Sequence, residues 1–314
     1  MPQIDIAGVP TASPARKGSF LVIGDWGYDS LRHGWDLPIG RCQRVIADKM
    51  HQTMGELGDI KLIINVGDSF YPGGVRDKND SQWDTKWRHV YSPELRSVPW
   101  YSVYGNHDYH LDSGCACGNS SATCAQVNGD IDDLDYFYMP STNWFKEHPE
   151  LDLEVVGLDM NHYVWAWNHN APNGGQNFED CMYSECEAQC LANAKARSEI
   201  GFELFYHRMK ESSAKNMLVF SHYPTDYFWM HPSFIATLQD DRRHKTFFFG
   251  GHRHNVDQSS TRPISPNVNW LVGGGGGWGC EGYGNNQGFV VGEIADDGTI
   301  TTRSVLVNRS VCCP

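Results

Sequence analysis

Seven short apolar runs, separated by amphipathic stretches, set the pattern of hydrophobic and polar positions in this chain. The runs predict strands over residues 19–25, 61–68, 99–106, 151–159, 216–222, 246–252 and 268–272. Apolar positions at helical spacing predict helices over residues 41–57, 81–90 and 185–212. Alternation on both sides of an Asp-Gly turn predicts a hairpin over residues 288–307. Strands that alternate with helices indicate an α/β protein.

Polar residues collect where the apolar runs end. Because α/β sheets bind ligands at the carboxyl ends of their strands, we expect a site along one rim of a mostly buried sheet. No repeat of fixed period and no linker interrupts the pattern, so residues 19–314 are predicted to form one domain. Residues 1–18 carry three prolines and no periodicity, and they are predicted to form an irregular tail.

Composition and charge exclude several classes of protein. The 314 residues are 40% hydrophobic and include 11 Trp, 14 Tyr and 14 Phe, which supplies a buried core and excludes a disordered chain. No apolar run approaches the roughly 18 residues of a membrane span. The net charge of −13, without a Lys/Arg cluster, argues against nucleic-acid binding. An acidic protein that handles anionic substrates needs a local positive centre, which a metal ion would supply.

The ten cysteines indicate a disulfide-bonded protein. They stand at positions 42, 115, 117, 124, 181, 186, 190, 280, 312 and 313. No pair has the Cys-x-x-Cys spacing of a zinc site, so we predict disulfides and leave their connectivity open. Sequons at Asn79, Asn119 and Asn308 agree with export, although the first seventeen residues lack the apolar core of a signal peptide. We expect a secreted glycoprotein, or one in another extracytoplasmic or lysosomal-type compartment.

Five of the predicted strands end in residues that commonly bind metals. These are Asp25; Asp68 with Tyr71; Asn106 with His107; His222; and His252 with His254. A single Asp after a strand is usually a turn former or a helix cap, and a single His is usually a surface or core residue. Five predicted strands that each end in a residue of this kind do not arise easily by chance. Oxygen and nitrogen donors that converge without basic partners favour a binuclear metal centre.

Five motifs in order carry a resemblance to a known family. They are Gly-Asp-x-Gly (24–27), Gly-Asp-x-x-Tyr (67–71), Gly-Asn-His-Asp (105–108), Ser-His-Tyr-Pro (221–224) and Gly-His-x-His (251–254). The set resembles the purple acid phosphatases, a branch of the calcineurin-like metallophosphoesterases, and the stretch around Asp68 looks closest to the small, tartrate-resistant type of mammals. The resemblance covers roughly residues 20–255. It implies a four-layer α/β/β/α sandwich with two central mixed sheets.

The resemblance also implies the metal ligands. Those of Fe(III) would be Asp25, Tyr71 and His254; those of a divalent metal (Fe, Zn or Mn) would be Asn106, His222 and His252, with Asp68 bridging the two. Phenolate is a hard, anionic donor that suits Fe(III), and its charge-transfer band would colour the protein purple. Most metallophosphoesterases carry Asp-x-His in the first motif. Here position 27 is Gly, and Tyr71 would supply the missing ligand.

The implied activity is that of an acid phosphatase that hydrolyses phosphomonoesters by attack of a metal-bound hydroxide at an Fe(III)–M(II) centre. Substrates would be small phosphate esters or phosphorylated peptides, and we expect a monomer. His107 and His231 fall where the family places phosphate-contacting histidines, and either could be the general acid, although His231 could also be a rim residue without a role. Asp108 either orients an imidazole or caps a turn. The run 273–277 lacks the Lys-Ser/Thr of a P-loop and would let the backbone pass close to the metals.

Two other functions compete with this one. The first is a catalytically silent scaffold on the same fold, as in the membrane-anchoring relatives of parasite motility complexes. The second keeps the site and hydrolyses phosphodiesters or nucleotides. Residues 167–190 lie where mammalian-type enzymes carry an inhibitory loop, so they either gate the site or form a disulfide-tied surface loop.

Overall fold

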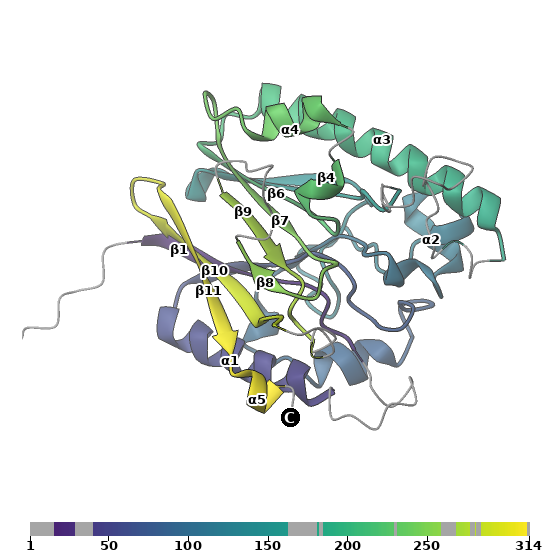
Figure 1. Cartoon of the computed structure of the whole chain (residues 1–314), viewed down its shortest axis with the longest axis horizontal. Helices are drawn as coiled ribbons and strands as arrows, with labels where there is room; N and C mark the ends of the chain where they lie inside the picture. The colour runs from purple at the N-terminus through teal and green to yellow at the C-terminus, as the bar shows by residue number, and fades with distance from the viewer. Residues whose placement is uncertain are drawn as a thin grey trace, which may run out of the picture.

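The computed structural model describes residues 16–28, 40–162, 181, 185–228, 231–258, 268–276, 280 and 284–312. Two mixed β-sheets lie between two layers of helices (Figure 1). Helices α3 (Glu187–Glu211) and α4 (Pro232–Leu238) cover one outer face, and α1 (Gly40–Leu57) and α5 (Arg309–Cys312) cover the other. The predicted α/β/β/α sandwich is therefore confirmed.

The first sheet has the strand order β11-β10-β1-β2-β3. Its strands are β1 (Arg16–Ile23), β2 (Ile60–Asn65), β3 (Trp100–Ser102), β10 (Gln287–Ala295) and β11 (Ile300–Val307). Strands β1, β2 and β3 are parallel, whereas β10 runs antiparallel to both β1 and β11. The carboxyl ends of β1, β2 and β3 therefore meet at one edge of this sheet.

The second sheet has the strand order β4-β5-β6-β7-β9-β8. Its strands are β4 (Trp144–His148), β5 (Leu153–Leu158), β6 (Asn216–Ser221), β7 (Lys245–Gly250), β8 (Val256–Asp257) and β9 (Val268–Val272). The four central strands β5, β6, β7 and β9 are parallel, and β4 and β8 pair antiparallel at the two edges. Helix α3 connects β5 to β6 and α4 connects β6 to β7, as in other parallel sheets.

Three apolar layers hold the sandwich together. In β1, Phe20 packs between the two sheets and Leu21 packs towards α1. In β7, Phe249 belongs to the layer between the sheets, where its ring meets Phe20, and Phe248 packs under α3 and α4. Since both faces of these strands are covered, their sequences read as continuous apolar runs rather than as alternating ones.

The longest helix, α3, is fixed to the second sheet by an ion pair. The guanidinium of Arg208 donates to both carboxylate oxygens of the buried Glu154 on β5, at 2.7 Å and 2.9 Å. A bidentate contact of this kind adds direction to the attraction between the charges. No helix in the described part of the chain is long and apolar enough to cross a membrane.

Most predicted elements are present, with shifted ends. The first strand begins at Arg16, three residues before the predicted start, because Arg16 already pairs with Ala295 of β10. The predicted tail 1–18 is corrected accordingly, and residues 1–15 lie outside the described part. The predicted helix 81–90 contains the short π-helix η2 (Trp83–Arg88). Strand β4 was not predicted because its sequence, WFKEH, is largely polar and half-exposed.

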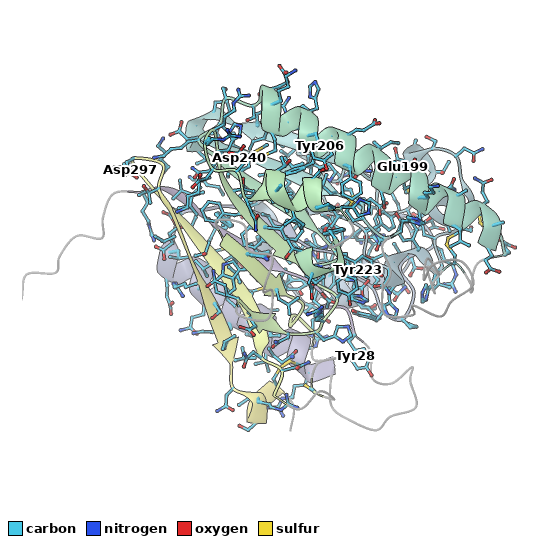
Figure 2. All side chains as sticks on the ribbon, turned by 45° about the horizontal axis from the view of Figure 1, so that its top comes forward. Tyr28, Glu199, Tyr206, Tyr223, Asp240 and Asp297 are labelled. Atoms are coloured by element: carbon cyan, nitrogen blue, oxygen red, sulfur yellow. A yellow bond between two sulfur atoms is a disulfide. The ribbon has the colours of Figure 1, made fainter. Side chains whose placement is uncertain are left out.

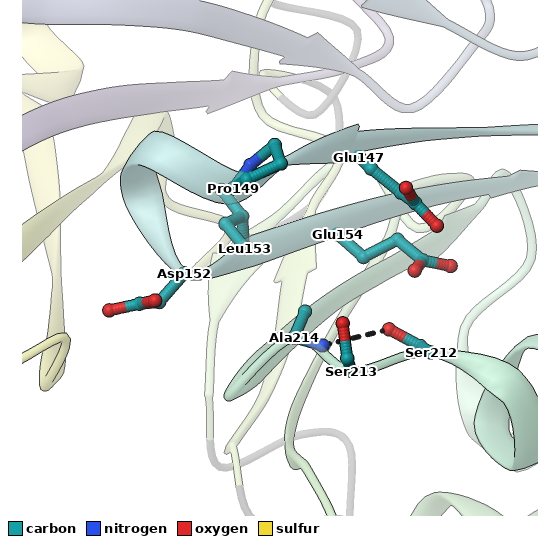
Figure 3. Close-up of a pocket in the computed structure, with 8 residues that line it drawn as sticks. All are labelled: Glu147, Pro149, Asp152, Leu153, Glu154, Ser212, Ser213 and Ala214. Carbon is teal, nitrogen blue, oxygen red and sulfur yellow. Dashed lines mark hydrogen bonds between the residues drawn. The ribbon is translucent and has the colours of Figure 1, made fainter.

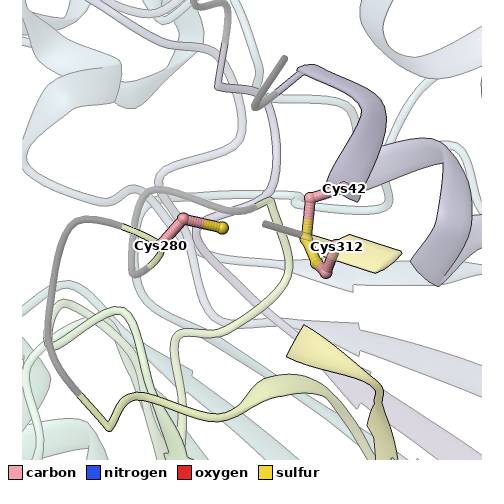
Figure 4. Close-up of side chains that lie close together, drawn as sticks. All are labelled: Cys42, Cys280 and Cys312. Atoms are coloured by element: carbon pink, nitrogen blue, oxygen red, sulfur yellow. A yellow bond between two sulfur atoms is a disulfide. The ribbon is translucent and has the colours of Figure 1, made fainter. Parts of the chain in front are cut away.

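Disulfides account for the described cysteines. The pairs are Cys42–Cys312, Cys115–Cys124, Cys117–Cys186 and Cys181–Cys190. Cys280 is also disulfide-bonded, and its sulfur lies beside the Cys42–Cys312 pair (Figure 4). Oxidised sulfurs are not thiolate ligands, so this group of three is not a metal site. The prediction of disulfides is confirmed; most of the segment 167–190 lies outside the described residues.

Candidate metal centre

The seven predicted ligands gather at the edge where the carboxyl ends of both sheets meet. The residues that follow the strands are Asp25 (β1), Asp68 (β2), Asn106 (β3), His222 (β6) and His252 (β7). Four candidate ligands have a positive φ: Asp25 (56°), Asp68 (52°), His252 (70°) and His254 (48°). Non-glycine residues adopt this region at an energetic cost, and such strain concentrates at functional sites.

Tyr71 belongs to the first of two groups of donors. Its hydroxyl oxygen lies 3.2 Å from Asp25 Oδ1 and 3.4 Å from His254 Nε2, and these two atoms are 3.5 Å apart. Asp25 and Tyr71 are fully buried. A carboxylate oxygen, a phenol oxygen and an imidazole nitrogen therefore lie close enough together to bind one cation.

Asn106 forms the second group. Its Oδ1 lies 2.9 Å from His222 Nε2 and 3.0 Å from His252 Nδ1. The other ring nitrogen of His222 donates to the carbonyl of Val66 at 3.0 Å. Metal-binding histidines commonly donate their second N–H in this way, which fixes the tautomer. The Nε2 atom of His222 is thus directed towards Asn106.

Asp68 joins the two groups. Its Oδ2 lies 2.8 Å from the Tyr71 hydroxyl and 3.3 Å from His222 Nε2, while its Oδ1 accepts the backbone N–H of His107 at 3.0 Å. One carboxylate oxygen therefore contacts a member of each group. The structure brings all seven predicted ligands together, in the two sets that the family resemblance implies for separate metals.

Burial and neighbouring negative charges disfavour the ionised forms of Asp25 and Tyr71. Burial raises the pKa of Asp25 well above its usual range; His222 lowers it in part, and Asp68 raises it again. Burial also raises the pKa of Tyr71, and the charges of Asp25 and Asp68 add to this effect. Burial would likewise raise the pKa of Asp68, but His222 and His107 outweigh it and hold that pKa below its usual range.

The histidines separate into neutral and charged members. Burial lowers the pKa of His252, and neighbouring His222 lowers it further; burial lowers the pKa of His254 to about 4. Burial would also lower the pKa of His222, but Asp68 outweighs burial and raises it to about 9. His252 and His254 are therefore neutral near neutral pH, the form in which imidazole binds a metal.

These residues fit a pair of cations. Two carboxylates and a phenol, all fully buried and in contact, repel one another as anions, and a cation among them would reverse that repulsion. The anionic oxygen donors suit a hard trivalent ion, whereas an amide and two imidazoles suit a divalent transition metal. The donor chemistry therefore agrees with the implied Fe(III)–M(II) pair.

His107 lies against this cluster. Its ring packs 4.7 Å from the ring of Tyr71, and its Nδ1–H donates to the carbonyl of Pro72 at 2.8 Å. This hydrogen bond fixes the orientation of the ring, so that Nε2 points away from Pro72. His110 packs beside His107 at 5.1 Å.

His231 has a different environment. It stands at the N-terminal end of α4, and its ring stacks on Phe202 of α3 with 4.6 Å between centroids. Burial lowers its pKa. Because this stacking contact is with α3 rather than with a candidate ligand, a contact between His231 and phosphate remains a prediction.

Asp108 caps the loops that carry the ligands. Its fully buried carboxylate accepts the backbone N–H groups of Ser69 (3.0 Å), Phe70 (3.2 Å) and Gly105 (2.9 Å). Of the two roles considered from the sequence, these contacts favour turn capping. Burial, with Asp68 nearby, raises the pKa of Asp108 to about 6.

Gly27 explains why the first motif lacks its histidine. A Cβ at this position would lie 1.9 Å from the carbonyl oxygen of Ser69, so no side chain fits there. The N–H of Tyr71 donates to the carbonyl of Gly27 at 3.2 Å. The two loops are thus in backbone contact, and Tyr71 reaches the cluster from the second loop.

Replacing Gly27 with Ala is expected to destabilise the fold by about 1–3 kcal/mol, because the methyl group would push the two loops apart. Thermal denaturation and metal analysis would measure this effect. Gly55→Ala is the matched control, since a Cβ there meets nothing within 4 Å and Ala favours a helix. An unchanged melting midpoint for Gly27→Ala would contradict the close contact of the loops.

The glycine run 273–277 passes close to the cluster, as predicted. A Cβ at Gly273 would lie 2.8 Å from the backbone nitrogen of His254 and 3.0 Å from Asp25 Oδ2. A Cβ at Gly251 would lie 2.4 Å from the same carboxylate oxygen. Both glycines leave room for Asp25; Gly277 lies outside the described residues.

A separate pocket of about 140 Å³ lies near the amino ends of β5 and β6 (Figure 3). Its lining residues are Glu147, Pro149, Asp152, Leu153, Glu154, Ser212, Ser213 and Ala214. Two of its carboxylates, Glu147 and Glu154, are paired with Arg208. The ligand cluster lies at the opposite, carboxyl ends of these strands. Figure 2 shows this separation: Tyr28 and Tyr223, which pack against candidate ligands, lie far from Asp297 at the hairpin tip, and the next residue of that tip, Gly298, lies beside Asp152 of the pocket. The pocket is therefore not part of the candidate centre.

Comparison with known proteins agrees with this geometry. The family model described as calcineurin-like phosphoesterase matches residues 18–256. Among solved structures, "GAP50 the anchor in the inner membrane complex of Plasmodium" is similar over 92% of this chain and 84% of that chain, with a TM-score of 0.56 and 18% identity. At this identity the likeness concerns the fold alone.

Curated relatives carry phosphatase names. Purple acid phosphatase 7 of Arabidopsis thaliana is 43% identical over 35% of this chain and 28% of its own length. Purple acid phosphatase 3 of the same plant is 25% identical over 82% of this chain and 63% of its own length. Human tartrate-resistant acid phosphatase type 5 is 36% identical over 36% of this chain and 31% of its own length. The chain thus spans less than two thirds of the length of these relatives. Their names confirm the resemblance to purple acid phosphatases. Because the family model matches most of the chain, the protein belongs to the calcineurin-like phosphoesterase family.

Proposed function

We propose that this protein is an acid phosphatase that hydrolyses phosphomonoesters at a binuclear Fe(III)–M(II) centre. The observation that carries the proposal is the contact of Asp68 Oδ2 with both Tyr71 and His222, which joins two donor sets into one. The family match and the phosphatase names of the relatives support a phosphoesterase in general. The four disulfides between described cysteines, together with the disulfide-bonded Cys280, support an extracytoplasmic location.

Each donor set has its own part in this proposal. Asp25, Tyr71 and His254 would hold Fe(III); Asn106, His222 and His252 would hold Fe, Zn or Mn in the divalent state; Asp68 would bridge. When bound, the two ions supply Lewis acidity for the phosphoryl group and for water. The buried, strained turns keep the donors in place before substrate arrives, so little reorganisation is needed during the reaction.

His107 is our candidate for proton transfer to the leaving group. The Nδ1–H bond to the Pro72 carbonyl orients the ring, and Nε2 would carry and release the proton. His231 is the second candidate for contact with the phosphate. A small phosphate ester or a phosphorylated peptide would be the substrate.

His107→Ala is expected to lower kcat by about 10²- to 10⁴-fold, the usual contribution of a general acid, while both metals stay bound. Steady-state kinetics with metal analysis would measure both. His51→Ala is the control, because His51 is exposed on α1. Loss of the metals together with activity would instead assign His107 a structural role.

Phosphate release from p-nitrophenyl phosphate at mildly acidic pH tests the proposed activity, with bis(p-nitrophenyl) phosphate assayed in parallel. The protein should be loaded with iron and then with Zn or Mn. Preference for the monoester supports the proposal. Preference for the diester would favour a phosphodiesterase, and no turnover of either by a fully loaded protein would favour a silent scaffold.

A further inference from the structure

Lys86 is the one lysine buried among the described residues, with 7% of its surface exposed. Its ammonium group donates to the backbone carbonyl of Gly27 at 3.0 Å and to that of Tyr71. Lysine is rarely buried, because removing the charge from water is costly unless strong acceptors replace the water. Its burial at this place therefore requires a structural reason.

The two carbonyls belong to the two loops that deliver the candidate iron ligands. Gly27 follows Asp25 by two residues, and Tyr71 is itself a candidate ligand. The carbonyl of Gly27 also accepts the N–H of Tyr71 at 3.2 Å. Lys86 therefore caps the junction between the loops, with charge-assisted hydrogen bonds that are about twice as strong as neutral ones.

Lys86 stands on a rigid support. It belongs to η2, and its own carbonyl accepts the side-chain amide of the buried Gln43 on α1 at 2.7 Å. Trp83 and Trp87, on the same helix, are buried in the aromatic core, where Trp83 packs 4.8 Å from Phe70. The lysine side chain thus extends from a fixed base to the loop junction.

We propose that Lys86 is a positioning residue for the Tyr71 side of the metal centre. Its ammonium fixes the peptide carbonyls of Gly27 and Tyr71, and so sets where the phenol of Tyr71 stands relative to the carboxylate of Asp25. The metal-related part of this inference rests on the proposed function. The positioning of the Tyr71 loop is a property of the metal-free chain and can be tested without any metal.

Lys86→Met and Lys86→Gln test the proposal. Met keeps the length and apolar character of the stem and removes all donors, whereas Gln keeps a neutral donor. Lys195→Met is the matched control, since Lys195 is exposed on α3. In the metal-free protein, the Tyr71 amide is expected to exchange its hydrogen at least about tenfold faster in Lys86→Met, less so in Lys86→Gln, and at an unchanged rate in the control. The amide of Val219 in β6 serves as the reference for global unfolding.

A second measurement uses the iron-loaded protein. Lys86→Met is expected to bind iron about 10- to 100-fold more weakly, which is the usual effect of changing a residue that orients a metal ligand. The variant is also expected to shift the visible absorption maximum. A merely stabilising role would lower the melting midpoint without moving that maximum.

The two measurements separate the possible failures. If the wild type binds no iron, the proposed function fails, and the exchange rate of the Tyr71 amide still decides the role of Lys86. If that rate is unchanged relative to Val219 in both variants, the proposal is overturned whatever the metal does. Faster exchange with an unchanged absorption maximum would also overturn the positioning of the phenol.

Discussion

Asp68→Asn is expected to remove most of the activity, by more than about 100-fold, and to lower the metal content of the protein. Changes to residues that only hold a metal ligand in place already cost about 10- to 100-fold in metal affinity or activity. Asp68 has a larger role, because one of its side-chain oxygens contacts a donor atom of each set. An amide keeps one oxygen but loses the negative charge that holds two cations close together. It also removes the carboxylate that raises the pKa of His222.

The measurement is kcat with metal analysis of the same sample. Asp130→Asn is the matched control, because Asp130 is exposed and far along the chain from every candidate ligand. A variant of Asp68 that keeps two metals per chain and activity within about tenfold of the wild type would contradict the bridging role.

Asp108→Asn is expected to cost about 2–3 kcal/mol of stability and to weaken metal binding about 10- to 100-fold. The carboxylate of Asp108 uses both oxygens to accept backbone N–H groups from the loops before Tyr71 and Asn106. The amide of Asn would replace one acceptor with a donor that faces another donor. A buried N–H without an acceptor carries its full desolvation penalty.

Thermal denaturation of the metal-free protein and metal titration would measure the two effects separately. Asp241→Asn on the exposed turn after α4 is the control. If Asp108→Asn melts like the wild type and binds metal normally, the loops are held together by other contacts and Asp108 is not required.

The sequence predicts the candidate site better than it predicts some of the fold. Residues such as Asp68 and His222 stand next to strongly apolar strands, so both their position at the sheet edge and their chemistry can be read locally. The parallel order of the strands then brings them together, although the sequence does not state that order. The backbone strain at Asp25 and His252 also has no sequence signal, because both turns depend on contacts with other loops.

Other features depend on contacts that are distant along the chain. Strand β4 pairs with β5 by its backbone while its side chains are polar, so periodicity does not reveal it. The burial of Lys86 depends on the loops of Gly27 and Tyr71, which are far from η2 in sequence. In the same way, the choice between the two roles of Asp108 required the positions of the amides around it.

The visible absorption spectrum of the iron-loaded protein, recorded with metal analysis, tests the central claim most directly. We predict about two metals per chain and a broad visible band from iron-bound phenolate, which Tyr71→Phe removes, because the hydroxyl of Tyr71 contacts both Asp25 and His254 in the candidate iron site. A colourless wild type, or a band that survives in Tyr71→Phe, would contradict the assignment of Tyr71 and of the iron site built on it.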